Sequence, residues 1–473
     1  MNEENRKLAE DNFEQELRTD LDDKTRDKPK GLALHTKILI GLLVGVVGGL
    51  AVNQIGKSSG ENFIAGIDWT IRNFTEPVGQ LFLNLLLMIV VPLVLSSLIV
   101  GVAGIGDVRK LGRVGFKSFA YCLIISAISV VIGLGLANTI KPGKWLAPDK
   151  AVELQERYKT QAGTTVEAAK KAEQAAAGDS PLMSVVKTIV PRNVFNSIAG
   201  ENPNMLHLMF FALIIGVAIT LLPATVSNPF VRGMSSLFEI TSKIIDMIMK
   251  FAPYAVACLI FNNMARFGID LLGTLFAFIL TVLLGLGIHF FGVYSLSVWF
   301  LSRINPIDFF RRVWLVIVTA FSTSSSNATL PTALRVSEEN LGVPKEINSF
   351  VLTVGATANQ NGTALYEGIT VLFLAQLAGV ELTFAQQLMV VYLAILGGIG
   401  TAGVPSGSIP FIIGILAMIG VNPALIAIIL GVDRILDMCR TTLNVVGDLT
   451  AATFVARSEG YELLQTPKKV EVL

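Results

Sequence analysis

Long apolar stretches separated by polar segments dominate this 473-residue chain and limit the folds that it can adopt. Hydrophobic residues make up 52% of the sequence and charged residues only 15%, which is unusual for a soluble globular protein. Most of the stretches are long enough to cross a hydrocarbon layer about 30 Å thick as helices. They lie near residues 37–53, 78–104, 115–140, 205–223, 240–262 and 269–301, and more follow after residue 347. The sequence therefore predicts an all-α polytopic membrane protein.

The positions of the basic residues predict how the chain is oriented in the membrane. Clusters of Lys and Arg follow the second and the sixth apolar stretch, at residues 109–117 and 303–312. By the positive-inside rule we expect both clusters and the N-terminal tail, residues 1–35, to be cytoplasmic. Span counting places the long Ala-rich segment 141–179 outside, although it carries Lys and Arg too. A formal net charge of +1 gives no reason to expect a nucleic-acid surface.

A polar stripe occurs in the last apolar region, where residues 431–448 read GVDRILDMCRTTLNVVGD. At the helical period, positions 433, 437, 440, 444 and 448 fall within roughly 80° of one another. A charge in the middle of a bilayer costs at least a few kcal/mol, so the stripe is expected to face a protein interior or a watery cavity. Such a stripe usually marks a substrate or ion path, and the alternative is a structural ladder of ion pairs.

Two apolar segments are broken by small or helix-breaking residues, FSTSSSNATLP from Phe321 and GGIGTAGVPSGSIP from Gly397. Continuous helix is costly there, and irregular backbone at membrane depth is tolerated only where it is buried in protein or lines a cavity. Paired interruptions in the two halves of a transporter indicate its binding site. Their flanks are too short for full spans, which favours re-entrant hairpins over ordinary loops.

A third interruption, TVGATANQNGTALYEG from Thr353 to Gly368, places amides and freed carbonyl groups inside an apolar helix. Oxygen atoms of this kind could coordinate a hard cation. Glu367 lies eight residues past Asn359, within roughly 80° of it around a helix. A buried carboxylate favours its neutral form, so Glu367 is a candidate proton carrier. A glutamate that is simply hydrogen-bonded within the bundle explains the same spacing.

The motifs TSSSNATLP, NQNGTALYEG, GIGTAGVP and DRILDMCRTTLNVVGD, in this order, resemble the dicarboxylate/amino acid:cation symporter family over residues 35–458. That family includes excitatory amino acid transporters and an archaeal aspartate transporter, itself a standard example of inverted repeats. For a prokaryotic member the resemblance implies eight transmembrane helices, two re-entrant helical hairpins, inverted repeats and an elevator-type mechanism. It also implies a homotrimer in the bacterial inner membrane that imports L-glutamate or L-aspartate with Na⁺.

The resemblance also divides the chain into two domains and two tails. Helices 1, 2, 4 and 5 would form a scaffold and trimerisation domain over residues 36–110 and 180–265. Helices 3, 6, 7 and 8 with both hairpins would form the transport domain over residues 111–140 and 266–458. Residues 141–179 would be an extracytoplasmic loop, and residues 459–473 a cytoplasmic C-terminal tail.

Matching the family's motifs residue by residue implies a substrate site and two sodium sites. Asp437 matches the acceptor for the substrate amino group, Arg440 the ligand of its side-chain carboxylate, and Asn444 a contact to its α-carboxylate. Further substrate contacts would come from Ser326, Thr363, Thr441 and the hairpin tip at Gly403 and Val404. One sodium site would comprise Gly355, Asn359, Asn444 and Asp448, and another the backbone near Thr357, Gly398, Ile399 and Thr401. Because Arg440 forks onto a carboxylate and Asp437 selects an ammonium, this pairing favours an acidic amino acid.

The chain departs from the family's pattern at a third sodium site. Asn361 replaces an aspartate in the core motif, and Cys122 and Ile125 stand where a tyrosine and a threonine are expected, which leaves Ser126. An amide oxygen binds Na⁺ more weakly than a carboxylate, and isoleucine offers no ligand. We therefore expect a degraded third site at Ser126, Asn359 and Asn361, with fewer than three Na⁺ per substrate.

A second departure concerns an arginine that relatives place at the positions of Ser324 or Met438. Arg434 lies one turn before Met438 and could supply a positive charge near Asp437. Alternatively, Arg434 is a structural partner of Asp433 or faces the cytoplasm. Since the arginine at those positions tunes ion coupling in relatives, the sequence does not predict potassium antiport.

Other functions fit the sequence less well. An H⁺-coupled glutamate symporter of the same fold stays open because of Glu367, and a C4-dicarboxylate symporter is the other alternative. An intramembrane aspartyl protease is disfavoured because Val445 stands where its signature needs glycine, and the three histidines lie outside any hydrolase triad. No catalytic residue is therefore predicted. The cysteines, Cys122, Cys258 and Cys439, have no metal-binding spacing.

Overall fold

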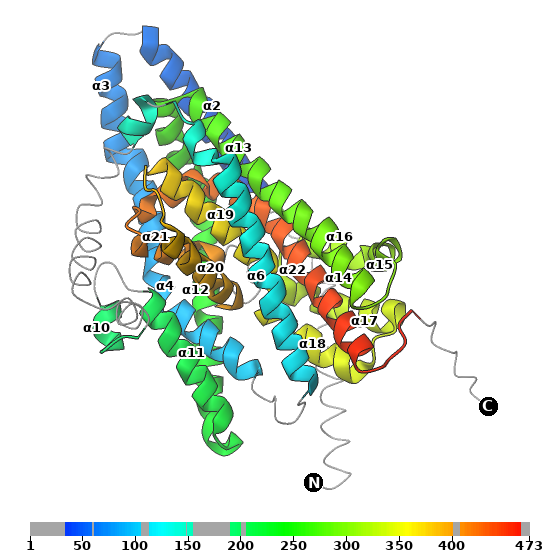
Figure 1. Cartoon of the computed structure of the whole chain (residues 1–473). Helices are drawn as coiled ribbons and strands as arrows, with labels where there is room; N and C mark the ends of the chain where they lie inside the picture. The colour runs from blue at the N-terminus through cyan, green and yellow to red at the C-terminus, as the bar shows by residue number, and fades with distance from the viewer. Residues whose placement is uncertain are drawn as a thin grey trace, which may run out of the picture.

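The computed structural model describes residues 34–58, 61–105, 113–147, 149–154, 190–199, 205–400 and 407–464. All regular elements in these ranges are helices, and they contain no β-strand. Figure 1 shows the helices packed into one bundle, with α22 (Leu430–Ser458) running through its middle. The short elements are α3 (Glu61–Thr70), η2 (Ile71–Thr75), η3 (Pro142–Trp145), α10 (Val194–Ile198), η4 (Ile288–Val293), α14 (Tyr294–Phe300), α15 (Pro306–Arg312) and η5 (Pro423–Ile428).

Five helices in the described ranges are long and apolar enough to cross a membrane. They cover five of the six apolar stretches predicted before residue 347, and the sixth forms the shorter helix α11 (Met205–Leu221). The five spans are Thr36–Gly56, Ala65–Ala103, Arg113–Trp145, Thr225–Phe267 and Ile269–Phe300. They belong to α2 (Leu34–Ser58), α4 (Glu76–Ile105), α6 (Arg113–Ile140), α12 (Ala224–Phe267) and α13 (Ile269–Gly287) with their neighbouring turns.

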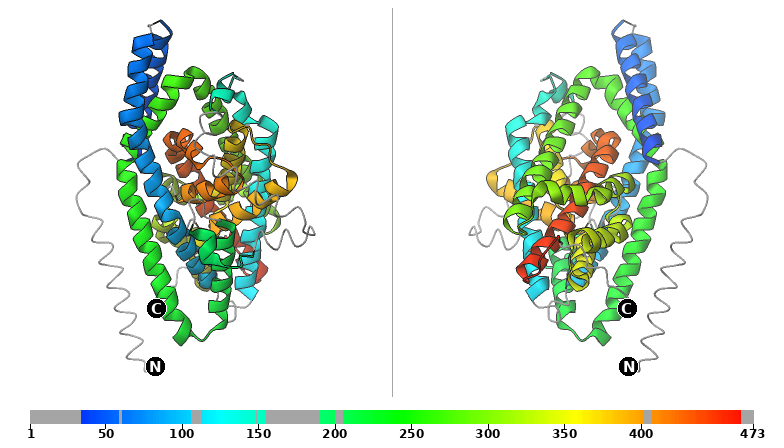
Figure 2. Two further views of the ribbon diagram at one scale, coloured as in Figure 1. Left: turned by 90° about the vertical axis from the view of Figure 1, so that its left-hand side faces the viewer. Right: turned by 90° about the vertical axis from the view of Figure 1, so that its right-hand side faces the viewer.

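The long helix α12 packs against α2 and α4 along one side of the bundle, as Figure 2 shows. Gly41, Gly45 and Gly49 repeat every four residues on α2 and let its backbone approach α12 closely. A Cβ added at Gly45 would lie 2.6 Å from a carbonyl oxygen of α12, that of Ala257. Small residues at this spacing drive helix packing in lipid, where no hydrophobic force acts between helices.

Helices from both halves of the chain surround one central helix, α19 (Asn361–Leu377). All of its residues except Gln376 are buried. Helices α6, α13, α22, α20 (Phe384–Gly400) and α21 (Ser408–Met418) pack around it. A helix that is covered on all sides is shielded from lipid, so its polar residues near Asn361 can face only protein or an enclosed cavity.

The predicted interruptions fall at helix ends. Helix α16 (Trp314–Thr323) stops at Ser324, which has a left-handed φ of 51°, and α17 (Ser326–Leu341) begins after the N-cap Ser325. Pro331 was expected within the break but lies inside α17. Helix α18 (Lys345–Ala358) ends at Asn359, before α19 begins. Between α20 and α21, residues 401–406 lie outside the described ranges, so the hairpin tip predicted there is not described.

An ion cluster joins the start of α6 to Glu459, which follows the last residue of α22. Lys117 Nζ lies 2.7 Å from a carboxylate oxygen of Glu459, and Arg113 contacts the other oxygen. The hydrogen bonds from Arg113 and Lys117 lower the pKa of Glu459 to about 2. These contacts hold the start of α6 against the end of α22.

Candidate functional site

The polar stripe of α22 lies inside the bundle, as its spacing predicts. Asp433, Asp437, Arg440, Asn444 and Asp448 each expose 4% or less of their surface. Helices α16, α17, α18 and α19 pack along α22 and bring the polar ends of the broken helices to it. Buried charged and amide groups are stable only when they are paired or hydrogen-bonded, so their partners define the chemistry of the site.

Arg440 is the centre of a buried ion cluster. Its Nη1 lies 3.1 Å from Asp433 Oδ1, and its Nη2 lies 2.9 Å from Asp437 Oδ1. The guanidinium carbon stands 4.1 Å from the ring centroid of Tyr366, a cation–π contact. Arg434 approaches Asp437 as well, with Nη1 3.3 Å from Oδ2. Two arginines and two aspartates balance in charge, which allows this group to sit within an apolar bundle.

A second cluster of amides joins α22 to both breaks. Asn444 Oδ1 accepts a hydrogen bond of 2.7 Å from the backbone N–H of Gly362. Asn444 Nδ2 donates to Thr363 Oγ1 at 3.1 Å and also to Gln360 Oε1. Gln360 Nε2 in turn lies 3.5 Å from Ser326 Oγ, at the start of α17. The structure therefore brings together the predicted substrate contacts Ser326, Thr363 and Asn444.

Asp448 faces the end of α18. Asn359 Nδ2 donates to Asp448 Oδ1 at 3.0 Å, and both residues are buried. Gly355 leaves room for the carboxylate, because a Cβ at that position would lie 2.5 Å from Asp448 Oδ1. Asn359 Oδ1 is buried and has no hydrogen-bond partner among the described residues. Carboxylate and amide oxygens collected in this way suit a hard cation such as Na⁺.

The other predicted ion and gate residues are only partly described. Gly398 packs against the backbone of Gln360, and Ile399 is buried at the end of α20. Thr357 lies in α18, Thr401, Gly403 and Val404 lie outside the described ranges, and Thr441 is buried beside Arg440 on α22.

The predicted third sodium site is filled by hydrogen bonds within the protein. Asn361 Oδ1 accepts from the Ser126 hydroxyl at 2.5 Å, and Asn361 Nδ2 donates to the Tyr294 hydroxyl at 3.0 Å. The Tyr294 hydroxyl donates to the Leu443 carbonyl at 3.1 Å, and the Ser129 hydroxyl donates to the Asn361 carbonyl at 2.6 Å. Asn361 therefore has partners on its amide oxygen, its amide nitrogen and its carbonyl without a cation.

Glu367 is fully buried one turn after Thr363 on α19. Its carboxylate lies against Gly397, where an added Cβ would be 2.3 Å from Oε2. Neither carboxylate oxygen has a hydrogen-bond partner in the described part of the chain. A buried carboxyl group without partners is stable in its neutral form, so the position suits a group that carries a proton.

Two members of the ion cluster, Asp433 and Tyr366, were not predicted as site residues from the sequence. Asp433 belongs to the stripe and lies seven residues before Arg440, a spacing that could have suggested contact on one helix face. Tyr366 gave no signal of its own, because its contact with Arg440 crosses from α19 to α22. No group of three or more His, Cys, Asp or Glu that could hold a metal occurs in the described ranges.

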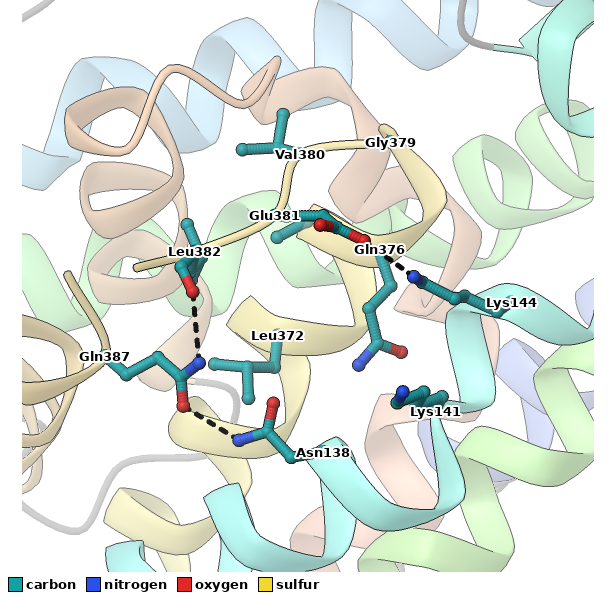
Figure 3. A pocket seen from close by; sticks show the side chains of 11 residues that line it. Asn138, Lys141, Lys144, Leu372, Gln376, Gly379, Val380, Glu381, Leu382 and Gln387 are labelled. Atoms are coloured by element: carbon teal, nitrogen blue, oxygen red, sulfur yellow. Dashed lines mark hydrogen bonds and ion pairs between the residues drawn. The ribbon is translucent and has the colours of Figure 1, made fainter. Parts of the chain in front are cut away.

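A surface pocket of about 260 Å³ lies away from this site, at the other end of α19. In Figure 3, Lys144 and Glu381 form an ion pair at its rim, and Gln387 bonds to Asn138 and to the carbonyl of Leu382. Lys144 lowers the pKa of the Glu381 carboxyl. Most polar groups of the pocket already bond to one another, so the buried clusters on α22 are the better candidates for a binding site.

Membrane-length helices, broken helices and a buried, charge-balanced polar cluster define the architecture of a secondary transporter. Residues 34–458 match the model of the sodium:dicarboxylate symporter family, and the chain belongs to that family. This confirms the family predicted from the four sequence motifs. The family consists of symporters, which are transporters rather than enzymes.

Several characterised relatives are similar to the chain over nearly its whole length. The proton/glutamate-aspartate symporter of Escherichia coli (strain K12) is 34% identical over 90% of this chain and 93% of its own. The proton/sodium-glutamate symport protein of Geobacillus stearothermophilus is 31% identical over 91% of this chain and 95% of its own. The human neutral amino acid transporter B(0) is 31% identical over 92% of this chain and 83% of its own.

Proposed function

We propose that this protein is a secondary active symporter that imports L-glutamate and L-aspartate together with Na⁺. The observation that carries the proposal is the buried guanidinium of Arg440, which pairs with Asp433 and Asp437 and presents the charge that a substrate carboxylate requires. Relatives named as glutamate-aspartate and glutamate symporters support the same substrate class. We assign no catalytic chemistry to the protein.

In this proposal the two clusters on α22 divide the substrate between them. Arg440 forks onto the side-chain carboxylate, and Asp437 accepts the amino group. Asn444 contacts the α-carboxylate, with Thr363, Thr441 and the backbone near Ser326 lining the site. Gly403 and Val404, at the tip between α20 and α21, would close over the substrate as a gate.

The coupling ions would bind next to the substrate. Asp448 and Asn359, with backbone oxygens near Gly355 and Asn444, form the first proposed sodium site, which the open Asn359 Oδ1 supports. The second proposed site uses backbone oxygens near Thr357, Gly398, Ile399 and Thr401. We propose no third Na⁺, because a cation at Asn361 would have to displace the hydrogen bonds from Ser126 and to Tyr294.

Two alternatives within the same fold have specific support. Glu367 could carry a proton in place of Na⁺, and the Escherichia coli relative is named a proton symporter. A C4-dicarboxylate is the other alternative substrate, in keeping with the name of the family. An experiment must therefore distinguish Na⁺ from H⁺ as the coupling ion, and amino acids from dicarboxylates as the substrate.

We further propose the membrane arrangement that the family resemblance implies. Eight transmembrane helices and two re-entrant hairpins, α16–α17 and α20–α21, would span the bacterial inner membrane as a homotrimer. Residues 36–110 and 180–265 would be the scaffold, against which residues 111–140 and 266–458 move as an elevator. Residues 1–35 and 459–473 would be cytoplasmic tails and residues 141–179 an external loop. The short α16 and α21 and the close α2–α12 packing agree with this division.

Uptake into proteoliposomes tests the proposal. Purified protein is reconstituted, and entry of labelled L-aspartate and L-glutamate is compared under an inward Na⁺ gradient and an inward H⁺ gradient at matched membrane potential. We expect concentrative uptake under the Na⁺ gradient and none under the H⁺ gradient. Uptake with H⁺ alone would contradict sodium coupling and make Glu367 the leading coupling residue. No uptake of either acid under any gradient would contradict the proposed substrate class.

A further inference from the structure

Arg434 contributes a charge to the ion cluster that the proposed binding scheme does not use. Its side chain is 14% exposed, compared with 2% for Arg440. Its only ion pair among the described residues is the one to Asp437, whereas Arg440 pairs with two aspartates and also contacts the ring of Tyr366. Arg434 and Asp433 also border a narrow gap that is otherwise lined by apolar residues, among them Ile38, Phe82 and Met249. Arg434 is therefore held less firmly than Arg440.

Asp437 forms ion pairs with both Arg434 and Arg440. Arg440 contacts Oδ1 through Nη2 at 2.9 Å and Nε at 3.0 Å, whereas Arg434 reaches Oδ2 through a single contact of 3.3 Å. A substrate ammonium that is to bind Asp437 must gain access to one of these oxygens. The single, longer and more exposed contact is the one that gives way at least cost.

We propose that Arg434 is an internal counter-ion for Asp437 that the amino group of the substrate displaces. This inference rests on the proposed role of Asp437. When the ligand is an acidic amino acid, its ammonium takes the place of Arg434 at Oδ2. When the ligand is a dicarboxylate without an amino group, Arg434 stays and keeps Asp437 neutralised. Arg434 is thus a specificity-determining residue that lets one site accept both classes of acid.

A purely structural role makes a different prediction. An ion pair between two largely buried side chains of one helix, with Arg434 14% and Asp437 6% exposed, acts mainly on the folding of the protein. Its loss would change the binding of both classes of acid equally. Only a displaceable counter-ion changes the ratio between an acid that brings its own ammonium and one that does not.

Competition for uptake measures this ratio. Entry of labelled L-aspartate into proteoliposomes, with Na⁺ and H⁺ gradients both present, is inhibited by unlabelled L-aspartate or by succinate, the same acid without its amino group. The variants are Arg434→Gln, and Arg434→Met in case the first does not fold. Arg434→Lys keeps the charge, and Arg457→Gln near the end of the same helix is the matched control, since Arg457 lies outside the site.

We expect succinate to compete in the wild type, and the succinate-to-aspartate ratio of inhibitory concentrations to rise about tenfold or more in Arg434→Gln and Arg434→Met. Arg434→Lys and Arg457→Gln should leave the ratio within about threefold of the wild type. An unchanged ratio in Arg434→Gln, a greater loss of aspartate than of succinate, or no competition by succinate in the wild type would overturn the inference. Absence of any aspartate uptake by the wild type would instead refute the proposed function on which it rests.

Discussion

Asn359 and Asn361 stand two residues apart at one helix break, yet only one of them leaves an oxygen open. Asn359 donates to Asp448, and its own buried Oδ1 has no hydrogen-bond partner among the described residues. Asn361 uses its amide oxygen, its amide nitrogen and its carbonyl in hydrogen bonds to Ser126, Tyr294 and Ser129. The same residue type therefore serves two purposes at the same depth in the bundle.

The difference follows from the cost of burying a polar atom. A buried acceptor without a hydrogen-bond partner costs about 1–3 kcal/mol of stability. A protein keeps such an acceptor where a ligand can supply the missing partner. The Asn359–Asp448 pair has this unfinished coordination, whereas the Asn361 network is complete without a ligand. Two of the tests below address this contrast and two address the carboxylates of Glu367 and Glu459, from the largest expected effect to the smallest.

Asp448→Asn removes the only charge at the proposed ion site and should have the largest effect. Because Na⁺ binding depends strongly on ligand charge, we expect the initial rate of Na⁺-driven aspartate uptake to fall by about 100-fold or more. Asp308→Asn, at an exposed position on α15, is the control and should keep the wild-type rate. A rate for Asp448→Asn within about threefold of the wild type would remove this site from the mechanism.

Asn361→Asp converts the complete network into an incomplete one. The variant loses the donor to Tyr294 and gains a carboxylate, so it should be less stable without Na⁺ and should bind an additional ion. We expect Na⁺ at about thirty times its dissociation constant to stabilise the variant by about 2 kcal/mol more than the wild type. Thermal melts of the purified protein across a Na⁺ series measure this. Equal Na⁺ dependence in the two proteins would show that the position binds no ion even with a carboxylate.

Glu367→Gln tests the other buried carboxylate without a partner. The amide cannot exchange a proton in the physiological range, so any stimulation of uptake by an inward H⁺ gradient should disappear. Na⁺-driven uptake should fall by no more than about threefold, because Asp448 stays intact. Uptake rates at fixed Na⁺ across pH 5–8 check this, and a more than tenfold loss at every pH would place Glu367 in the sodium-coupled path.

Glu459→Gln should have the smallest effect, since this carboxylate lies just past the end of α22, away from the proposed site. Arg113 and Lys117 depress its pKa to about 2, so its contribution to stability is present above the ordinary pKa of about 4.3 and is lost as pH falls towards 2. We expect a melting temperature about 1 °C lower than that of the wild type at pH 7, with the difference vanishing near pH 2. Glu338→Gln, exposed on α17, is the control. A difference that persists at pH 2 would point to a cause other than ionisation.

Much of the fold could be predicted from apolar length and helix-breaking residues. Five of six early stretches form membrane-length helices, because runs of this length can satisfy their backbone only as helices. Residues 205–223 gave the shorter α11, which composition alone does not distinguish from a full span. Pro331 was placed in a break but lies inside α17, since only Ser324 and Ser325 leave the helical conformation there.

The stripe on α22 was predictable because helical periodicity fixes which residues share one face. Which partners meet that face depends on the rotation and depth of neighbouring helices, and no local spacing encodes these. The sequence by itself therefore determined the membrane class, the family and the polar face from Asp433 to Asp448. Only the tertiary structure decided that Tyr366 covers Arg440, that Asn361 is satisfied by Ser126 and Tyr294, and that Arg434 rests on Asp437.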